Sequence, residues 1–155
     1  MIWKSPHISK VYEALTAIAD KRIEIEENIA RCYSSSRGKF YEVKYDPKSD
    51  SIMSDDNTAY YTDSVSYPMI ALLMLKGKLA YEERLLPMLE GIYWKDINQK
   101  FRNNYDEAIE CVLTGLKEKG VDTQFVRMEI AKIYEEICNM KLNYLGQKRR
   151  PPEAY

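Results

Sequence analysis

The chain has 155 residues, of which 45% are hydrophobic and 30% are charged, so its composition is globular and excludes an intrinsically disordered chain. This length suits a single domain whose core is large enough to fold without disulfide bonds. The formal net charge of −1 leaves no overall field that would attract nucleic acid or an anionic membrane.

The first predicted element is a long helix near the start of the chain. The opening ten residues contain no apolar run of the kind that a secretory signal needs, so we expect a cytosolic protein with no membrane partner. Ser5 is placed to cap a helix, and Pro6 suits its first turn. Apolar residues then recur at alternating spacings of three and four, which is typical of two helices packed lengthwise. The pattern predicts one helix over residues 6–33, and only Arg22 interrupts its apolar stripe.

The segment SSSRGK, residues 34–39, has the composition of an anion-binding loop, because it combines hydroxyls, backbone N–H groups and two cations. A phosphate-binding loop must precede a helix, so that the first N–H groups of the helix face the anion. Here the predicted helix ends and a strand begins. We therefore interpret the segment as a linker in which Gly38 supplies a positive φ.

A small antiparallel sheet is predicted after the first helix. Residues 39–45 alternate apolar and charged side chains, which is the pattern of a strand with one buried face. The turn residues 46–50 follow, and residues 51–54 can return as the partner strand. Residues 58–62 are rich in side chains that favour strands and are predicted to add a third one.

The second half of the chain is predicted to be helical. The apolar run 69–75 is too short to cross a bilayer and indicates a buried helix, and a charged segment over 81–86 follows it. Capping signals and apolar spacing then predict two longer helices, over residues 96–119 and 123–145. The last helix has the same spacing as the first, so we expect these two to pack lengthwise, with Arg22 outside the core or beside a carboxylate.

The fold class that follows is α+β and mostly α. We expect about five helices, with a small two- or three-stranded antiparallel sheet inserted after the first long helix. Residues 1–146 should form one globular domain, and the basic, proline-containing tail 147–155 should be mobile.

Motifs for the common enzyme classes are absent from the sequence. There is no nucleophile elbow, no zinc-protease motif, no P-loop and no dinucleotide-binding fingerprint. One histidine and three scattered cysteines cannot make a usual transition-metal site, so we expect no metal and no cofactor. The cysteines Cys32, Cys111 and Cys138 lie beside apolar helical positions and are predicted to be buried thiols.

The acidic and tyrosine-rich stretch SDDNTAYYTDS, residues 54–64, is the main candidate site. Its oxygen ligands do not have calcium-loop spacing, because the sixth and twelfth positions from Asp55 are Tyr60 and Ser66. The stretch is predicted to be a turn and a strand that exposes one tyrosine and buries the other. The candidate binding surface consists of Asp55, Asp56, Asn57, Tyr60, Tyr61 and Asp63.

The functional expectation rests on the tyrosine content. Thirteen tyrosines against three phenylalanines mildly favour a recognition surface, the alternative being that the rings line the junction between the sheet and the helices. The leading hypothesis is a cytosolic, non-enzymatic protein-interaction module, with a second copy of the chain, as a homodimer, among its candidate partners. The alternative is a small-ligand-binding protein or enzyme with a carboxylate and tyrosine pocket near residues 54–66. The second alternative is a weak nucleic-acid binder that uses the basic tail residues Lys148, Arg149 and Arg150, although the near-neutral net charge argues against it.

Overall fold

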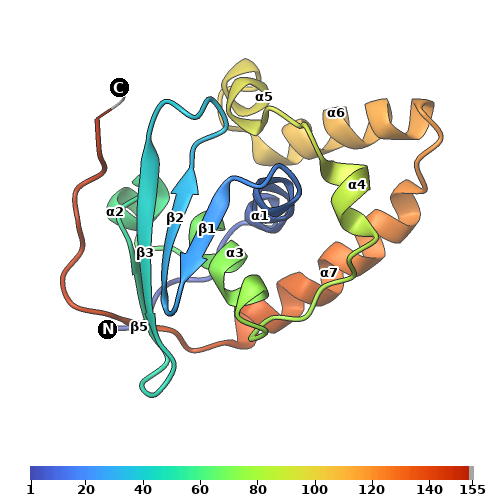
Figure 1. The fold of residues 1–155 in the computed structure, drawn as a ribbon. Helices are drawn as coiled ribbons and strands as arrows, with labels where there is room; N and C mark the ends of the chain where they lie inside the picture. The colour runs from blue at the N-terminus through green and yellow to red at the C-terminus, as the bar shows by residue number, and fades with distance from the viewer. Residues whose placement is uncertain (154–155) are drawn as a thin grey trace.

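The computed structural model describes residues 1–153 and shows a sheet with most of the helices on one of its faces (Figure 1). Within these residues there are seven helices and five strands. The helices are α1 (Ser9–Ala19), α2 (Asn57–Thr62), α3 (Tyr67–Leu75), α4 (Leu85–Leu89), α5 (Trp94–Lys100), α6 (Tyr105–Glu118) and α7 (Thr123–Asn139). The strands are β1 (Ile23–Glu26), β2 (Ile29–Tyr33), β3 (Phe40–Asp46), β4 (Ser51–Ser54) and β5 (Asn143–Tyr144).

The sheet is mixed, with the strand order β1-β2-β3-β4-β5. The first four strands pair antiparallel in chain order, and the short β5 then pairs parallel to β4. Alternation along β3 buries Tyr41, Val43 and Tyr45 against the helices and leaves Glu42 and Lys44 on the opposite face. The predicted strand over 39–45 and its return over 51–54 are therefore confirmed.

The predicted long helix over 6–33 is wrong, because α1 ends at Ala19 and a hairpin of β1 and β2 follows it. Lys21 and Glu27 both adopt left-handed backbone conformations, with φ of 56° and 57°, and these break the helix and turn the hairpin. The sequence IEIE alternates apolar and charged side chains, which suits the half-buried strand β1. The isoleucines of this region also fit the helical spacing of three and four residues, so the alternation of a strand was not recognised.

The predicted third strand over 58–62 is also wrong, because these residues belong to α2. Asp56 is the N-cap of this helix, and its Oδ1 accepts a hydrogen bond from the backbone N–H of Ala59 at 2.9 Å. Asp63 ends the helix in a left-handed conformation. The fold is thus a five-stranded mixed sheet with seven described helices, and not five helices with a two- or three-stranded antiparallel sheet.

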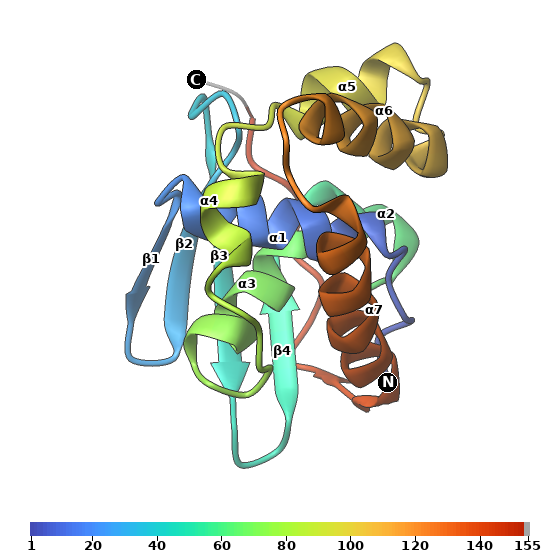
Figure 2. The ribbon, with the colours of Figure 1, turned by 90° about the vertical axis from the view of Figure 1, so that its right-hand side faces the viewer.

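The core lies between the sheet and the helices on its covered face. Residues 68–74 of α3 are all buried, as expected for the apolar run, and α1 packs mainly against α3 and α4. Helix α7 also contacts α1, but Figure 2 shows α1 lying across α7 instead of along it. The first and last helices are therefore in contact, but they do not pack lengthwise as the apolar spacing predicted.

None of the helices in the described part of the chain is long and apolar enough to span a membrane. The longest, α7, has 17 residues and is amphipathic, with Val126, Ile130, Ile133 and Ile137 buried.

A candidate ligand-binding cavity

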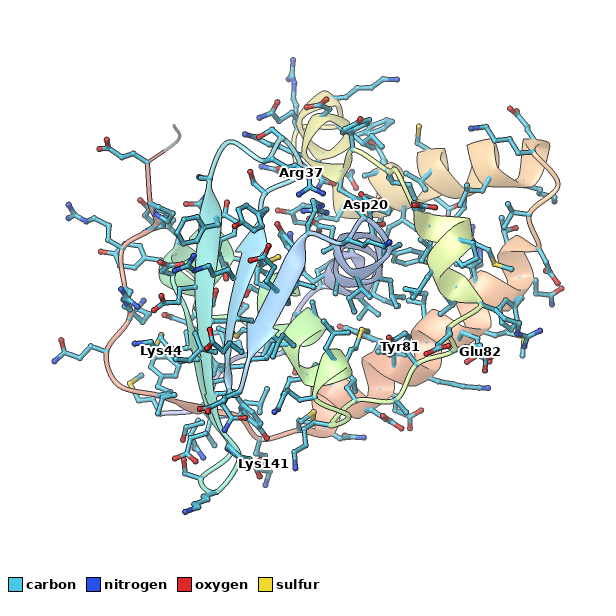
Figure 3. The ribbon with its side chains drawn as sticks, in the orientation of Figure 1. Asp20, Arg37, Lys44, Tyr81, Glu82 and Lys141 are labelled. Carbon is cyan, nitrogen blue, oxygen red and sulfur yellow. The ribbon has the colours of Figure 1, made fainter. Side chains whose placement is uncertain are left out.

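A polar cavity of about 280 Å³ lies where α1, α5, the start of α2 and the ends of β2 and β3 meet. The segment 34–39 forms one wall, and Arg37 ties it to α1, because Arg37 Nη2 donates to the carbonyl of Asp20 at 3.0 Å. Figure 3 shows Arg37 and Asp20 together at this end of the molecule, near α5. The positive φ of this loop belongs to Arg37, at 59°, and not to Gly38 as predicted.

The charges around the cavity are unequal. Among the described residues that line it, four side chains are cationic and two are anionic, an excess of two positive charges. The cationic residues are Lys10, Arg22, Lys39 and Lys95, and the anionic residues are Glu13 and Asp56. A concave site with an excess of one sign of charge attracts a ligand of the opposite sign.

Arg22 is the most deeply buried cation of the lining, with 4% of its surface exposed. Its Nη1 donates to the carbonyl of Tyr33 at 2.7 Å, and its Nε lies 3.8 Å from the carboxylate of Asp20. Within residues 1–153, the Nε atom has no hydrogen-bond partner. Because guanidinium carries five N–H donors, Arg22 keeps donors for an oxygen-bearing ligand.

Lys10 and Glu13 form a buried ion pair on the cavity side of α1, with 3.1 Å between Nζ and Oε2. Burial raises the pKa of Glu13 above its ordinary value, and the positive charges of Lys10 and Arg22 oppose that rise. Burial alone would lower the pKa of Lys10, but the negative charge of Glu13 and the proximity of Tyr105 raise it overall. Lys10 is thus held as a cation beside the Glu13 carboxyl group.

Helix α5 brings a carboxamide to the opposite side of the cavity. Asn98 is 7% exposed, and none of the described residues supplies a hydrogen bond to its Oδ1. The helix is fixed over α1 because Trp94 Nε1 donates to Thr16 Oγ1 at 2.9 Å, and that hydroxyl donates to the carbonyl of Leu89 at 2.7 Å. A buried amide oxygen in a rigid wall is a place for a ligand donor.

Tyr67 lines the cavity, and the buried Cys32 lies beside Tyr67 behind this lining. Burial raises the pKa of Tyr67 well above the ordinary value for a phenol. Burial also raises the pKa of the Cys32 thiol to about 12, against a smaller opposite effect from Arg22. Since only the thiolate is a good nucleophile, this raised pKa disfavours Cys32 as a covalent catalyst.

Asp56 has its oxygens occupied by the protein itself. The hydroxyls of Ser54 and Ser66 both donate to Oδ2 at 2.5 Å, while Oδ1 caps α2 through the backbone of Ala59. The carboxylate borders the cavity, yet these three bonds give it a structural role.

The structure does not bring the six residues of the candidate surface together. Asp56 and Asn57 line the cavity, whereas Asp55 accepts a hydrogen bond from the backbone of Glu42 at 2.9 Å. Tyr61 is 71% exposed, and Tyr60 is half-buried beside it with ring centroids 5.0 Å apart. Asp63 accepts a hydrogen bond from Lys148.

The basic tail residues lie against the domain in the described structure. Lys148 Nζ is 2.5 Å from the carboxylate of Asp63 and 2.9 Å from the carbonyl of Tyr60. Arg149 Nη1 donates to Glu42 Oε1 at 2.9 Å, while Arg150 is exposed. The C-terminal segment runs along the side of the sheet away from most helices (Figure 1).

Sequence reasoning missed the residues that give the cavity its character, because they were assigned to an apolar helix stripe or to a linker. Arg22 was a usable signal, since a lone cation in an apolar stripe needs a reason to be there. Segment 34–39 is a linker as predicted, although it joins strand β2 to strand β3 and not a helix to a strand, and its Ser34, Ser35 and Lys39 line the cavity. Asn98 carried no sequence signal.

Metal ligands do not cluster anywhere in the described residues, where no group of three or more His, Cys, Asp or Glu side chains could hold an ion. The three cysteines form no disulfide within residues 1–153. Cys32 is buried as predicted, but Cys111 is exposed and Cys138 is only half-buried at the edge of the core.

Comparison with known proteins gives one match. The model of a family described as "Uncharacterised conserved protein UCP014422" matches residues 3–143, a range that contains every described residue lining the cavity. No curated protein and no solved structure matches the chain. Because the matched range covers most of the sequence, the chain belongs to the family of uncharacterised conserved proteins UCP014422.

Proposed function

We propose that this protein binds a small molecule with a carboxylate or phosphate group in the cavity between α1 and α5. The observation that carries the proposal is Arg22, a guanidinium that is 4% exposed and whose Nε has no hydrogen-bond partner among the described residues, with the Asp20 carboxylate 3.8 Å away. Burying a cation with unused donors is costly unless a ligand oxygen or water satisfies it. This is a development of the pocket hypothesis, with the pocket bordered by Asp56, Asn57 and Thr58.

The other charged side chains of the cavity also favour an anionic ligand. Lys39 and Lys95 come from the loop and from α5, so cations approach the cavity from two separate elements. Lys10 adds a third cation, which Glu13 partly neutralises. The excess of two positive charges suits an anionic ligand, and the volume of about 280 Å³ suits one smaller than a typical drug-sized ligand.

A test uses inorganic phosphate and succinate as probes, with binding measured by calorimetry and by thermal stabilisation. Arg22→Gln should weaken binding by about tenfold or more, because a hydrogen bond to a charged group contributes about 1.5–3 kcal/mol. Arg31→Gln is the matched control, since Arg31 is an exposed arginine of β2 whose side chain stacks on Phe40. The control should bind as the unchanged protein does.

A second variant keeps the test decisive if Arg22→Gln does not fold. Lys95 is exposed at the rim, so Lys95→Gln should leave stability nearly unchanged and weaken anion binding by about threefold. Equal affinity of both variants and the unchanged protein for both probes would overturn the proposal, as would the absence of binding by the unchanged protein.

A catalytic role is the second candidate function, and Glu13 favours it. This carboxyl lines the cavity, is buried, and has a raised pKa, which are the properties of a general acid or base. If the protein is an enzyme, Glu13→Gln should abolish turnover while it leaves anion binding through Arg22 nearly intact.

The interaction-module hypothesis and the cytosolic location both stay predictions. Exposed Tyr61 offers a rigid ring for a protein partner or for a second copy of the chain. Sedimentation of the unchanged protein and of Tyr61→Ala would test self-association, because a dimer that uses this ring should weaken in the variant. The nucleic-acid hypothesis is the weakest of the three, since Lys148 and Arg149 already pair with carboxylates.

A further inference from the structure

We infer that the ligand is a hydroxylated anion, such as a sugar phosphate or a sugar acid, whose hydroxyl donates a hydrogen bond to Asn98. This inference rests on the proposed anion binding and adds the chemistry of the rest of the ligand. The anionic group belongs with Arg22, and the hydroxyl-bearing part belongs with α5.

The amide oxygen of Asn98 is the first observation. The residue is more than nine-tenths buried, lines the cavity, and its Oδ1 has no hydrogen-bond partner in the described part of the chain. An unpaired buried acceptor costs about 1–3 kcal/mol, so a partner from the ligand or from water is expected. The complement of an amide oxygen is an O–H or N–H donor.

The polar neighbours of Asn98 are the second observation. Besides its tyrosines, the described lining contains four carboxamides and three serine or threonine hydroxyls, which come from α2, from α5 and its following loop, and from segment 34–39. They are Asn57, Asn98, Gln99, Asn103, Ser34, Ser35 and Thr58. Each of these groups can donate and accept hydrogen bonds, which matches a ligand with several hydroxyls better than one with an apolar body.

The charge balance decides between a hydroxyl donor and an ammonium donor. The lining already carries an excess of two positive charges, so a further cation would be repelled. The two described anionic side chains, Glu13 and Asp56, are engaged by Lys10 and by two serine hydroxyls. A neutral donor attached to an anion therefore fits the cavity, whereas an ammonium does not.

The aromatic lining is consistent with a ligand of this kind. Trp94 of α5 and Tyr105 of α6 line the cavity, and Lys10 Nζ lies 4.4 Å from the ring centroid of Tyr105. Aromatic rings provide flat apolar surface for the C–H groups of a polyol, while amides and hydroxyls bind its oxygens. The cavity thus combines the three kinds of contact that a sugar phosphate needs.

The experiment compares two matched pairs of probes by calorimetry. Glycerol 3-phosphate and propyl phosphate differ by two hydroxyls, and glycerate and propionate differ in the same way with a carboxylate as the anion. In the unchanged protein, the hydroxylated member of at least one pair should bind about tenfold tighter, as the loss of one or two hydrogen bonds implies. The pair that shows the preference identifies the anionic group as phosphate or carboxylate.

The variant Asn98→Leu should reduce this preference to less than about threefold while propyl phosphate or propionate keeps its affinity. Asn139→Leu is the control, since Asn139 is an exposed residue at the end of α7 and should retain the full preference. Gln99→Leu, on the exposed side of α5, gives a second reading if Asn98→Leu fails to fold.

Three results would overturn the inference in distinguishable ways. If no probe binds, the proposed function fails together with the inference. If both members of each pair bind equally, the anion site stands and the hydroxyl inference is wrong. If Asn98→Leu and Gln99→Leu both keep the full preference, α5 does not receive the hydroxyl and the assignment is wrong.

Discussion

Replacing Asp56 by alanine is predicted to destabilise the protein far more than the loss of an ordinary helix cap. The carboxylate caps α2 by accepting a hydrogen bond from the backbone N–H of Ala59, and it also accepts hydrogen bonds from the buried hydroxyls of Ser54 and Ser66. Losing an N-cap costs about 1 kcal/mol, and each hydrogen bond to a charged acceptor contributes about 1.5–3 kcal/mol. Because neighbouring effects are not additive, we expect a total of about 3–5 kcal/mol, the range seen when a buried charged network is broken.

The matched control is Asp122→Ala. Asp122 caps α7 through the backbone N–H of Phe125 at 3.1 Å, in an exposed position. This variant should lose only about 1 kcal/mol of unfolding free energy. Urea unfolding followed by circular dichroism gives the unfolding free energy of both variants. In thermal unfolding, Asp56→Ala should melt at a temperature on the order of 10 °C below that of Asp122→Ala. Equal destabilisation by the two substitutions would refute the reasoning about the buried serine hydroxyls.

Three further predictions concern other parts of the fold. Burial raises the pKa of Glu13 above its ordinary 4.5, so the folded protein binds more protons there than the unfolded chain, and stability should fall as pH rises through the folded pKa. Glu13→Gln should remove this fall, so that the melting temperature of the variant changes less as pH rises above 4.5. Cys111 should react quickly with a thiol reagent, while Cys32, whose pKa burial raises to about 12, should react only after unfolding, as mass spectrometry of labelled protein would show. Ile70→Ala should lose about 2–5 kcal/mol in urea unfolding because Ile70 is fully buried, while Leu75→Ala, at a position 40% exposed, should lose less than half as much.

The sequence predicted those elements whose pattern has a single reading. The run 69–75 is apolar throughout and became the buried helix α3, and the alternation over 39–45 became β3. The prediction for the IEIE stretch of β1 was wrong because Ile25 and Ile29 fit the spacing of a helix as well as that of a hairpin. The hairpin differs from a continuous helix at residues in the left-handed conformation, such as Glu27. That conformation is uncommon for residues other than glycine, so the sequence does not indicate it.

The candidate site was predictable only at its edge. Asp56 and Asn57 stood out as an acidic turn and do border the cavity, although the six-residue surface around them is dispersed. The cavity itself is made by α1, α5 and segment 34–39, which are far apart in the chain. Single-sequence patterns carry no information about such long-range contacts, so only the structure could show that Arg22 and Asn98 line the same cavity.

The most direct measurement of the central claim is the NMR signal of the Arg22 Nε–H group during titration with anionic probes. This N–H is buried and has no acceptor among residues 1–153, so its proton should be visible and its resonance should depend on what fills the cavity. The account predicts a saturable shift of this resonance with phosphate or a hydroxylated anion, which Arg31 does not share. A resonance of Arg22 that stays unchanged while every probe reaches saturating concentration in a parallel binding assay would contradict the account.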